Sequence, residues 1–114
     1  MMHPLELAKI SKCLSVETRI RLLRLIKDQS LCVGALAKRL GITPGAVSQH
    51  LRVLKAADLI IPEKRGYFMH YQINQRVIDR WVCSLSQAFG REAGREYGER
   101  IFPISLDSKG EKNV

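Results

Sequence analysis

The five residues Leu-Gly-Ile-Thr-Pro that begin at Leu40 constrain the fold more than any other stretch of this sequence. Gly41 stands where a left-handed residue closes a helix. Thr43 and Pro44 then follow in the order that starts a new helix, with threonine as the N-cap and proline in the first turn. Two helices joined by so short a turn form a helix-turn-helix. We therefore predict one helix over 33–40 and the next over 44–57.

The rest of the chain supplies three more helices and a hairpin. Ser15 is a candidate N-cap for the second helix, whose apolar residues surround most of its circumference and indicate a buried position. Beyond residue 57 the apolar period changes from 3.6 to 2, and Lys64-Arg65-Gly66 supplies a turn between two strands. The predicted elements are helices over 5–14, 16–27 and from 74 to 89, and strands over 59–63 and 67–73. A continuation of the last helix past Gly90 towards Tyr97 is compatible with the pattern.

This element order predicts a mainly α, α+β fold, a winged helix-turn-helix with about five helices and a two-stranded β-hairpin as the wing. A chain of 114 residues holds one such core, which we place over 1–100. The polar segment over 101–114 is expected to be a disordered tail.

The charge balance favours a polyanionic partner. The chain has 19 Lys and Arg against 11 Asp and Glu, a formal net charge of +8. It has no stretch of the length that a membrane span needs and no signal peptide at its start, so a cytoplasmic location without membrane contact is expected. It also has no glycine-rich phosphate loop, no nucleophile beside a base and no paired carboxylates, so an enzyme is not expected.

The helix predicted over 44–57 has the two faces of a recognition helix. Val47, Leu51 and Leu54 share the inner side, whereas small and polar residues lie on the other. Glutamine can pair bidentately with adenine and arginine with guanine in the major groove, and basic hairpin residues suit phosphate or the minor groove. The candidate DNA-binding residues are Thr43, Gly45, Ser48, Gln49, Arg52, Lys55, Lys64, Arg65 and Tyr67. Tyr67 also fits a core position, and His50 is interpreted as a packed histidine on the flank.

Three stretches of the chain resemble the ArsR/SmtB family of bacterial repressors. They are Cys13-Leu14-Ser15-x-x-Thr18-Arg19-x-x-Leu22-Leu23, Leu31-Cys32-Val33-x-x-Leu36-Ala37 and Val47-Ser48-Gln49-His50-Leu51-x-x-Leu54. The resemblance implies a homodimer formed through the first and last helices, and repression of an inverted-repeat operator on double-stranded DNA. It also implies release by a metal, metalloid or redox inducer. The candidate dimer-interface residues are Leu7, Ile10, Trp81, Leu85 and Phe89.

The sensor positions of that family are incomplete here. The arsenic-type Cys-x-Cys at the start of the third helix reads Cys32-Val33-Gly34, and the acid-x-His opening of the zinc-type site is absent at Asn74. Cys32 nevertheless occupies a helix N-terminus, which lowers a thiol pKa, so we keep it as a candidate inducer-sensing residue. Cys13 and Cys83 lie off the main apolar stripes and are further candidates, with As(III) or another thiophilic metal as the possible ligand. The alternative is that all three cysteines are small apolar fillers.

Two other functions stay open at this point. The chain could be a winged-helix repressor that responds to no ligand, or a winged-helix module that binds another protein. A protein-binding version would carry an apolar or acidic surface where this sequence places Gln49 and Arg52. The residues of the helix predicted over 44–57 therefore favour DNA.

Overall fold

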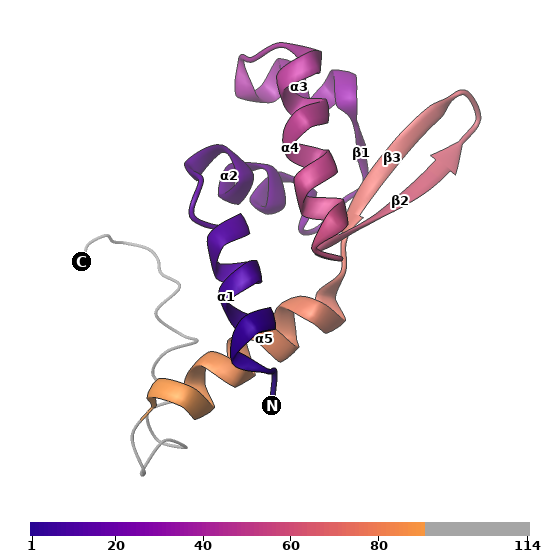
Figure 1. Cartoon of the computed structure of the whole chain (residues 1–114). Coiled ribbons are helices and arrows are strands. Elements are labelled where there is room, and N and C mark those ends of the chain that lie inside the picture. Colours follow the sequence, from indigo (N-terminus) through magenta and orange to yellow (C-terminus); the bar gives the residue numbers. More distant parts are fainter. Residues whose placement is uncertain (91–114) are drawn as a thin grey trace.

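The structure, a computed structural model, describes residues 1–90 of the chain, and the expected tail over 101–114 lies outside them. The possible helix continuation past Gly90 lies outside them as well. The elements in chain order are α1 (Pro4–Cys13), α2 (Glu17–Ile26), β1 (Leu31–Cys32), α3 (Val33–Leu40), α4 (Pro44–Ala56), β2 (Ile60–Arg65), β3 (Phe68–Ile73) and α5 (Gln75–Phe89). Figure 1 shows the β2–β3 hairpin projecting from the helical body as a wing. The predicted winged helix-turn-helix fold is confirmed.

The turn between α3 and α4 forms as its residues dictate. Gly41 has φ 69°, and its N–H donates to the carbonyl of Ala37 across 2.9 Å. The Thr43 hydroxyl oxygen accepts from the N–H of Ala46 across 3.1 Å, so threonine is the N-cap, and Pro44 opens α4. These local predictions are confirmed.

The start of α2 differs from the expectation. Val16 is the residue before the helix, and no side chain caps its first turn. The Ser15 hydroxyl instead donates to the carbonyl of Lys12 across 2.7 Å in the turn that follows α1. A serine can satisfy a carbonyl behind it as well as an N–H ahead of it, which is why Ser15 was wrongly assigned as an N-cap.

The sheet has three strands in the order β1-β3-β2, not the two that were expected. Leu31 lies opposite Tyr71 and Cys32 lies opposite His70 in antiparallel register. A two-residue strand is too short to show an alternating pattern, so only its pairing with β3 reveals it.

The wing turn lies at Gly66 and Tyr67, not at Lys64-Arg65-Gly66 as the sequence indicated. Arg65 pairs with Phe68, so Gly66 and Tyr67 form a two-residue connection, and Lys64 and Arg65 belong to β2. Gly66 has φ 61° at the first central position, where two-residue hairpin turns require a positive φ. The glycine therefore sets the register of the hairpin.

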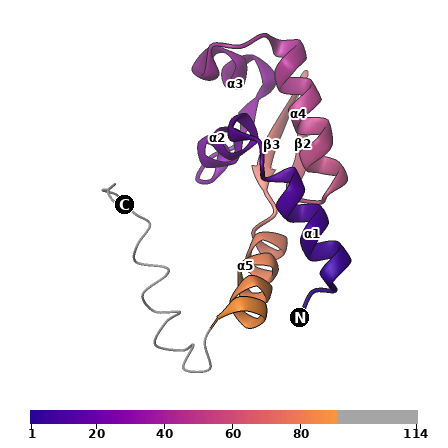
Figure 2. The same cartoon turned by 60° about the vertical axis from the view of Figure 1, so that its left-hand side comes forward.

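The core lies where α2, α3 and α4 meet the base of the sheet, and Val47, Leu51 and Leu54 contribute the inner side of α4 as predicted. Against this core α1 and α5 lie side by side (Figure 2). The N–H of Met2 donates to the buried hydroxyl of Ser84 across 2.9 Å, and Trp81 Nε1 donates to Ser11 Oγ across 3.2 Å. Within residues 1–90, no helix is long and apolar enough to cross a membrane.

Candidate DNA-binding interface

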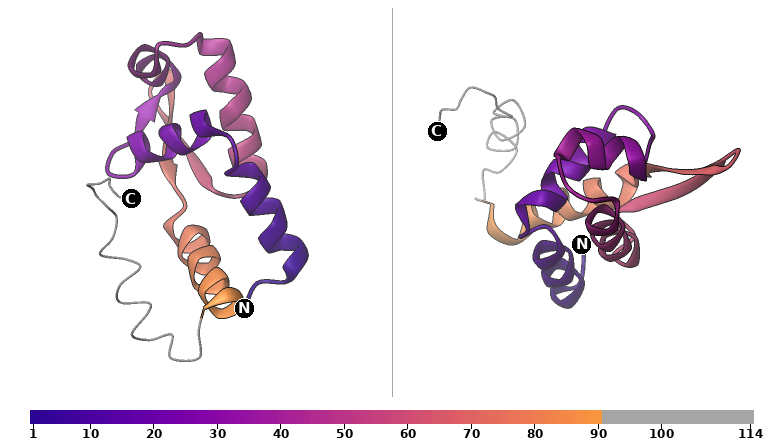
Figure 3. Two further views of the ribbon diagram at one scale, coloured as in Figure 1. Left: turned by 90° about the vertical axis from the view of Figure 1, so that its left-hand side faces the viewer. Right: turned by 90° about the horizontal axis from the view of Figure 1, so that it is seen from above.

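The outer side of α4 is exposed to solvent. Ser48, Gln49, Arg52 and Lys55 are all exposed, while the residues between them on the inner side are buried. The α3–α4 turn and the tip of the wing lie at the same end of the molecule, as Figure 1 and the left view of Figure 3 show. Two elements that can contact one duplex are therefore presented together.

Gly45 marks the place where α4 can be approached most closely. A Cβ atom added there would meet only Thr43 Oγ1, at 3.9 Å, so the fold itself does not require a glycine. The bare backbone in the first turn of α4 leaves room for a large partner. Thr43 is also exposed, but its hydroxyl oxygen is already engaged in capping the helix.

The wing presents exposed basic and aromatic side chains. Tyr67 is 99% exposed at the hairpin tip, so the core position that its alternation allowed is wrong. Its neighbours Phe68 and Met69 are exposed as well, and the sequence reading did not include them among the candidate contacts. The misplaced turn accounts for both errors. The sequence prediction began the second strand at Tyr67, whereas Tyr67 lies in the turn and the strand begins at Phe68.

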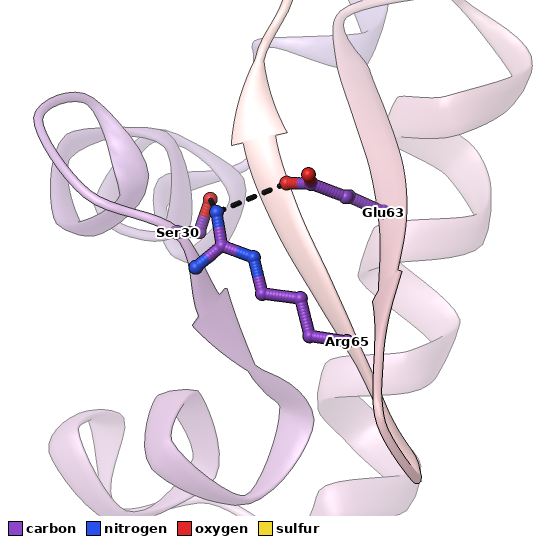
Figure 4. A network of polar contacts seen from close by, with 3 residues as sticks. All are labelled: Ser30, Glu63 and Arg65. Carbon is purple, nitrogen blue, oxygen red and sulfur yellow. Dashed lines mark hydrogen bonds and ion pairs between the residues drawn. The ribbon is translucent and has the colours of Figure 1, made fainter.

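The Arg65 side chain contacts two polar side chains, those of Glu63 and Ser30. Its Nη2 lies 3.0 Å from Glu63 Oε1 and 3.4 Å from Ser30 Oγ, and Figure 4 shows the side chain crossing the sheet towards Ser30. Within the described part of the chain, Lys64 forms no such ion pair. The two basic residues of the wing therefore differ in how freely they can reach a phosphate.

His50 lies on the flank of α4, half-buried against α2. Its Nδ1 accepts a hydrogen bond from Arg19 Nε across 3.3 Å, which fits the expected packed histidine. Arg19 also donates from Nη1 to the carbonyl of Cys13 across 3.0 Å. No periodic signal in the sequence pointed to Arg19, because its partners come from two other helices.

The three cysteines occupy different environments. Cys13 is buried in the core, which corrects the expectation that it lies off the apolar stripe, and this burial raises the pKa of its thiol above the ordinary value. Cys32 is half-buried at the N-cap position of α3, where its side chain makes no hydrogen bond to the helix, and Cys83 is exposed on α5. In residues 1–90 no group of three or more His, Cys, Asp and Glu side chains could hold a metal ion.

His70 lies in β3, the middle strand of the sheet. It is half-buried, and its Nδ1 is buried without a hydrogen-bond partner in the described structure. Cys32 of β1 and Glu63 of β2 lie opposite His70 in the sheet.

The candidate dimer-interface residues divide into two groups. Leu7 and Ile10 of α1 are buried inside the chain itself, so they are not a surface for a partner. Trp81 and Leu85 of α5 are half-buried, and Phe89 is 79% exposed. Leu5, which was not a candidate, is 65% exposed. The apolar residues of a helix recur with the same period whether they face the core of their own chain or a partner chain. The sequence therefore does not show which of the two surfaces covers them.

Comparison with known proteins adds to this geometry. The sequence model described as "Bacterial regulatory protein, arsR family" matches residues 17–61. The Transcriptional repressor SdpR of Bacillus subtilis (strain 168) is 32% identical over 69 residues, 60% of this chain and 77% of that protein. The Arsenical resistance operon repressor of Escherichia coli (strain K12) is 30% identical over 104 residues, 82% of this chain and 86% of that protein.

Among solved structures, an ArsR-like transcriptional regulator from Rhodococcus sp. RHA1 is similar with a TM-score of 0.68 and 27% identity. The match covers 89% of this chain and 91% of that one. The stretch that the family model matches, residues 17–61, runs from α2 through the helix-turn-helix to the start of the wing.

Proposed function

The chain belongs to the arsR family of bacterial regulatory proteins, and on that premise we propose that it is a dimeric repressor that reads an inverted-repeat DNA site. It is a transcriptional regulator with a winged helix-turn-helix, not an enzyme. The dimer, the operator and the response to an inducer are the parts that we propose.

The exposed outer side of α4 carries the proposal for direct reading of bases. Gln49 and Arg52 stand one turn apart on that side and have the side chains that pair bidentately with adenine and guanine. Gly45, one turn before Gln49, lets the helix backbone come close to the groove. Lys64 and Tyr67 of the wing would contact the backbone or the minor groove beside it.

The proposed dimer rests on apolar side chains that the described chain leaves uncovered. Phe89 and Leu5 are exposed on α5 and α1, and Trp81 and Leu85 continue the apolar side of α5. Pairing two copies through these helices would relate two recognition helices by a two-fold axis. Their half-sites would then lie one helical turn apart, ~34 Å.

Selection of duplexes from a random library by the full chain tests this proposal. We expect an inverted repeat, bound by two copies in analytical ultracentrifugation. Gln49→Ala and Arg52→Ala should each lose about 1–3 kcal/mol for the selected duplex and much less for a scrambled one. The matched control is Lys27→Ala, which removes an exposed cation beside the end of α2. Selection of no duplex at all would leave a protein-binding module as the better hypothesis.

A thiol-reactive inducer is the finer part of the proposal. Cys32 supports it by its position, because it is half-exposed at the start of the helix that precedes the DNA-reading turn. A species captured there causes release only if it fits the DNA-free state better. As(III), Cd(II), Zn(II), peroxide and persulfide should be tested for release of the parent and of Cys32→Ser. An unresponsive parent would favour a repressor that needs no inducer.

A second thiol is required by the same proposal. Cys83 is exposed on α5, whereas Cys13 is buried and its raised pKa disfavours the thiolate that binds metals and metalloids. If an inducer releases DNA from the parent and Cys32→Ser abolishes that release, we expect Cys83→Ser to reduce it as well. Cys13→Ser should leave the release unchanged.

A further inference from the structure

A cavity of about 610 Å³ lies between α1, the start of α2 and the C-terminal half of α4. Its size is that of pockets that bind small organic molecules. Ile10 and Cys13 of α1 and Val53 and Ala57 of α4 form its apolar lining. Because the Cys13 thiol lies 4.0 Å from the Val53 carbonyl, the floor of the cavity is where α1 and α4 come together.

The charges around this cavity favour an anion. Lys9, Lys12 and Arg19 line it, and among residues 1–90 none of the three forms an ion pair. Of its two carboxylates, Glu6 lies 3.7 Å from Arg80 of α5, which leaves Asp58 alone to offset three cations. An apolar space lined by unpaired cations suits a carboxylate on an apolar body.

Asp58 adds an observation of a different kind. It has φ 61°, and it is the one residue other than glycine with a positive φ in the described structure. It follows the C-cap of α4, where the N–H of Leu59 donates to the carbonyl of Leu54 across 3.0 Å, so this conformation is the one that ends the helix, and aspartate tolerates it better than most residues. At this position the chain leaves α4 and turns towards β2, so the wall of the cavity is also the exit of the recognition helix.

Arg19 links the cavity to α4. Arg19 lines the cavity, and its guanidinium group donates to Nδ1 of His50 and to the carbonyl of Cys13. A carboxylate bound in the cavity would compete for this guanidinium group, since charge-assisted hydrogen bonds are stronger than neutral ones. None of the cavity residues is among the candidate DNA contacts, so the two sites do not overlap.

We propose that this cavity binds a small organic carboxylate with an apolar body, and that Arg19 passes the binding on to α4 through His50. This site lies apart from Cys32 and goes beyond the DNA-reading function. Its test contains no DNA, so its failure and a failure of the proposed function are separate results.

Octanoate is the probe, titrated into the full chain by isothermal calorimetry, with octylammonium as a ligand of the same length and opposite charge. We expect octanoate to bind and octylammonium not to. Arg19→Gln should weaken octanoate binding about tenfold or more, because a charge-assisted hydrogen bond is lost. Ala56→Phe should do the same by filling the cavity from its exposed rim, where the new ring does not disturb the core.

Two variants serve as controls. Arg24→Gln removes an exposed cation from the same helix outside the cavity, and Cys32→Ser removes the candidate sensor thiol. Both should bind octanoate as the parent does. Should Arg19→Gln fail to fold, Lys9→Gln and Lys12→Gln provide the charge test at exposed positions.

The link to α4 is read from the ring signals of His50 by NMR. We expect them to shift when octanoate is added to the parent and to stay in place in Ala56→Phe. Equal binding of octanoate and octylammonium, or unchanged binding by Ala56→Phe, would overturn the site. Octanoate binding without a change at His50 would overturn the role of Arg19.

Discussion

Arg19 of α2 and His50 of α4 are joined by a hydrogen bond of 3.3 Å from Nε to Nδ1. The same guanidinium group holds the carbonyl of Cys13 at the end of α1 across 3.0 Å, so one side chain connects three helices. His50 is next to Gln49, the residue that we assign to base reading. The hydrogen bond from Arg19 therefore ties α4 to α2 beside that residue.

A double-mutant cycle on this pair should show coupling. We expect Arg19→Ala and His50→Ala each to lower the free energy of unfolding, with a coupling energy of about 1 kcal/mol measured by urea denaturation. Arg21→Ala is the control, because its ion pair with Glu17 is exposed and should contribute about 0–0.5 kcal/mol. Additive losses at Arg19 and His50 would mean that the hydrogen bond adds nothing to packing.

Gly34 inside α3 and Gly41 just after it should respond to alanine with opposite signs. Gly41 has φ 69°, which alanine disfavours, so Gly41→Ala should destabilise the protein by about 1 kcal/mol. Gly34 lies inside the helix with open space around an added Cβ, so Gly34→Ala should stabilise it by up to about 1 kcal/mol. Thermal unfolding of both variants checks the pair. Stability changes of the same sign in the two variants would contradict the left-handed conformation of Gly41 or the helical one of Gly34.

Releasing Arg65 should strengthen binding to any duplex. Glu63→Gln removes the carboxylate that holds Arg65 and also one negative charge from the wing. We expect tighter binding of selected and scrambled duplexes alike, with a salt slope steeper by about 1. Lys64→Ala should weaken binding of both duplexes and make the salt slope less steep. A Glu63→Gln variant with an altered sequence preference would instead mean that the wing reads bases.

The thiols should react in an order set by burial. Cys83 is exposed and should be alkylated by iodoacetamide well before Cys13, whose burial raises its pKa and keeps the unreactive thiol form. Mass spectrometry of peptides after timed alkylation, at pH 7 and pH 9, gives the two rates. The difference should disappear in urea. Equal rates in the folded protein would show that the core opens at Cys13.

The sequence by itself determined the features that depend on neighbouring residues. Gly41, Thr43 and Pro44 specify the turn through backbone conformation and capping, which act within a few residues. The 3.6-residue period of Val47, Leu51 and Leu54 likewise separates the buried and exposed sides of α4. The fold class and the exposed side of α4 follow from these local rules.

Only the tertiary structure decided which distant groups meet. The pairing of β1 with β3 buries His70 Nδ1, and the docking of α1 on α5 takes Leu7 and Ile10 away from any partner. Arg19 and His50 are 31 residues apart, and the cavity beside them exists only where three helices converge. The period of the apolar residues predicts that a side chain is buried. Which helix or strand buries it depends on the packing of the whole chain.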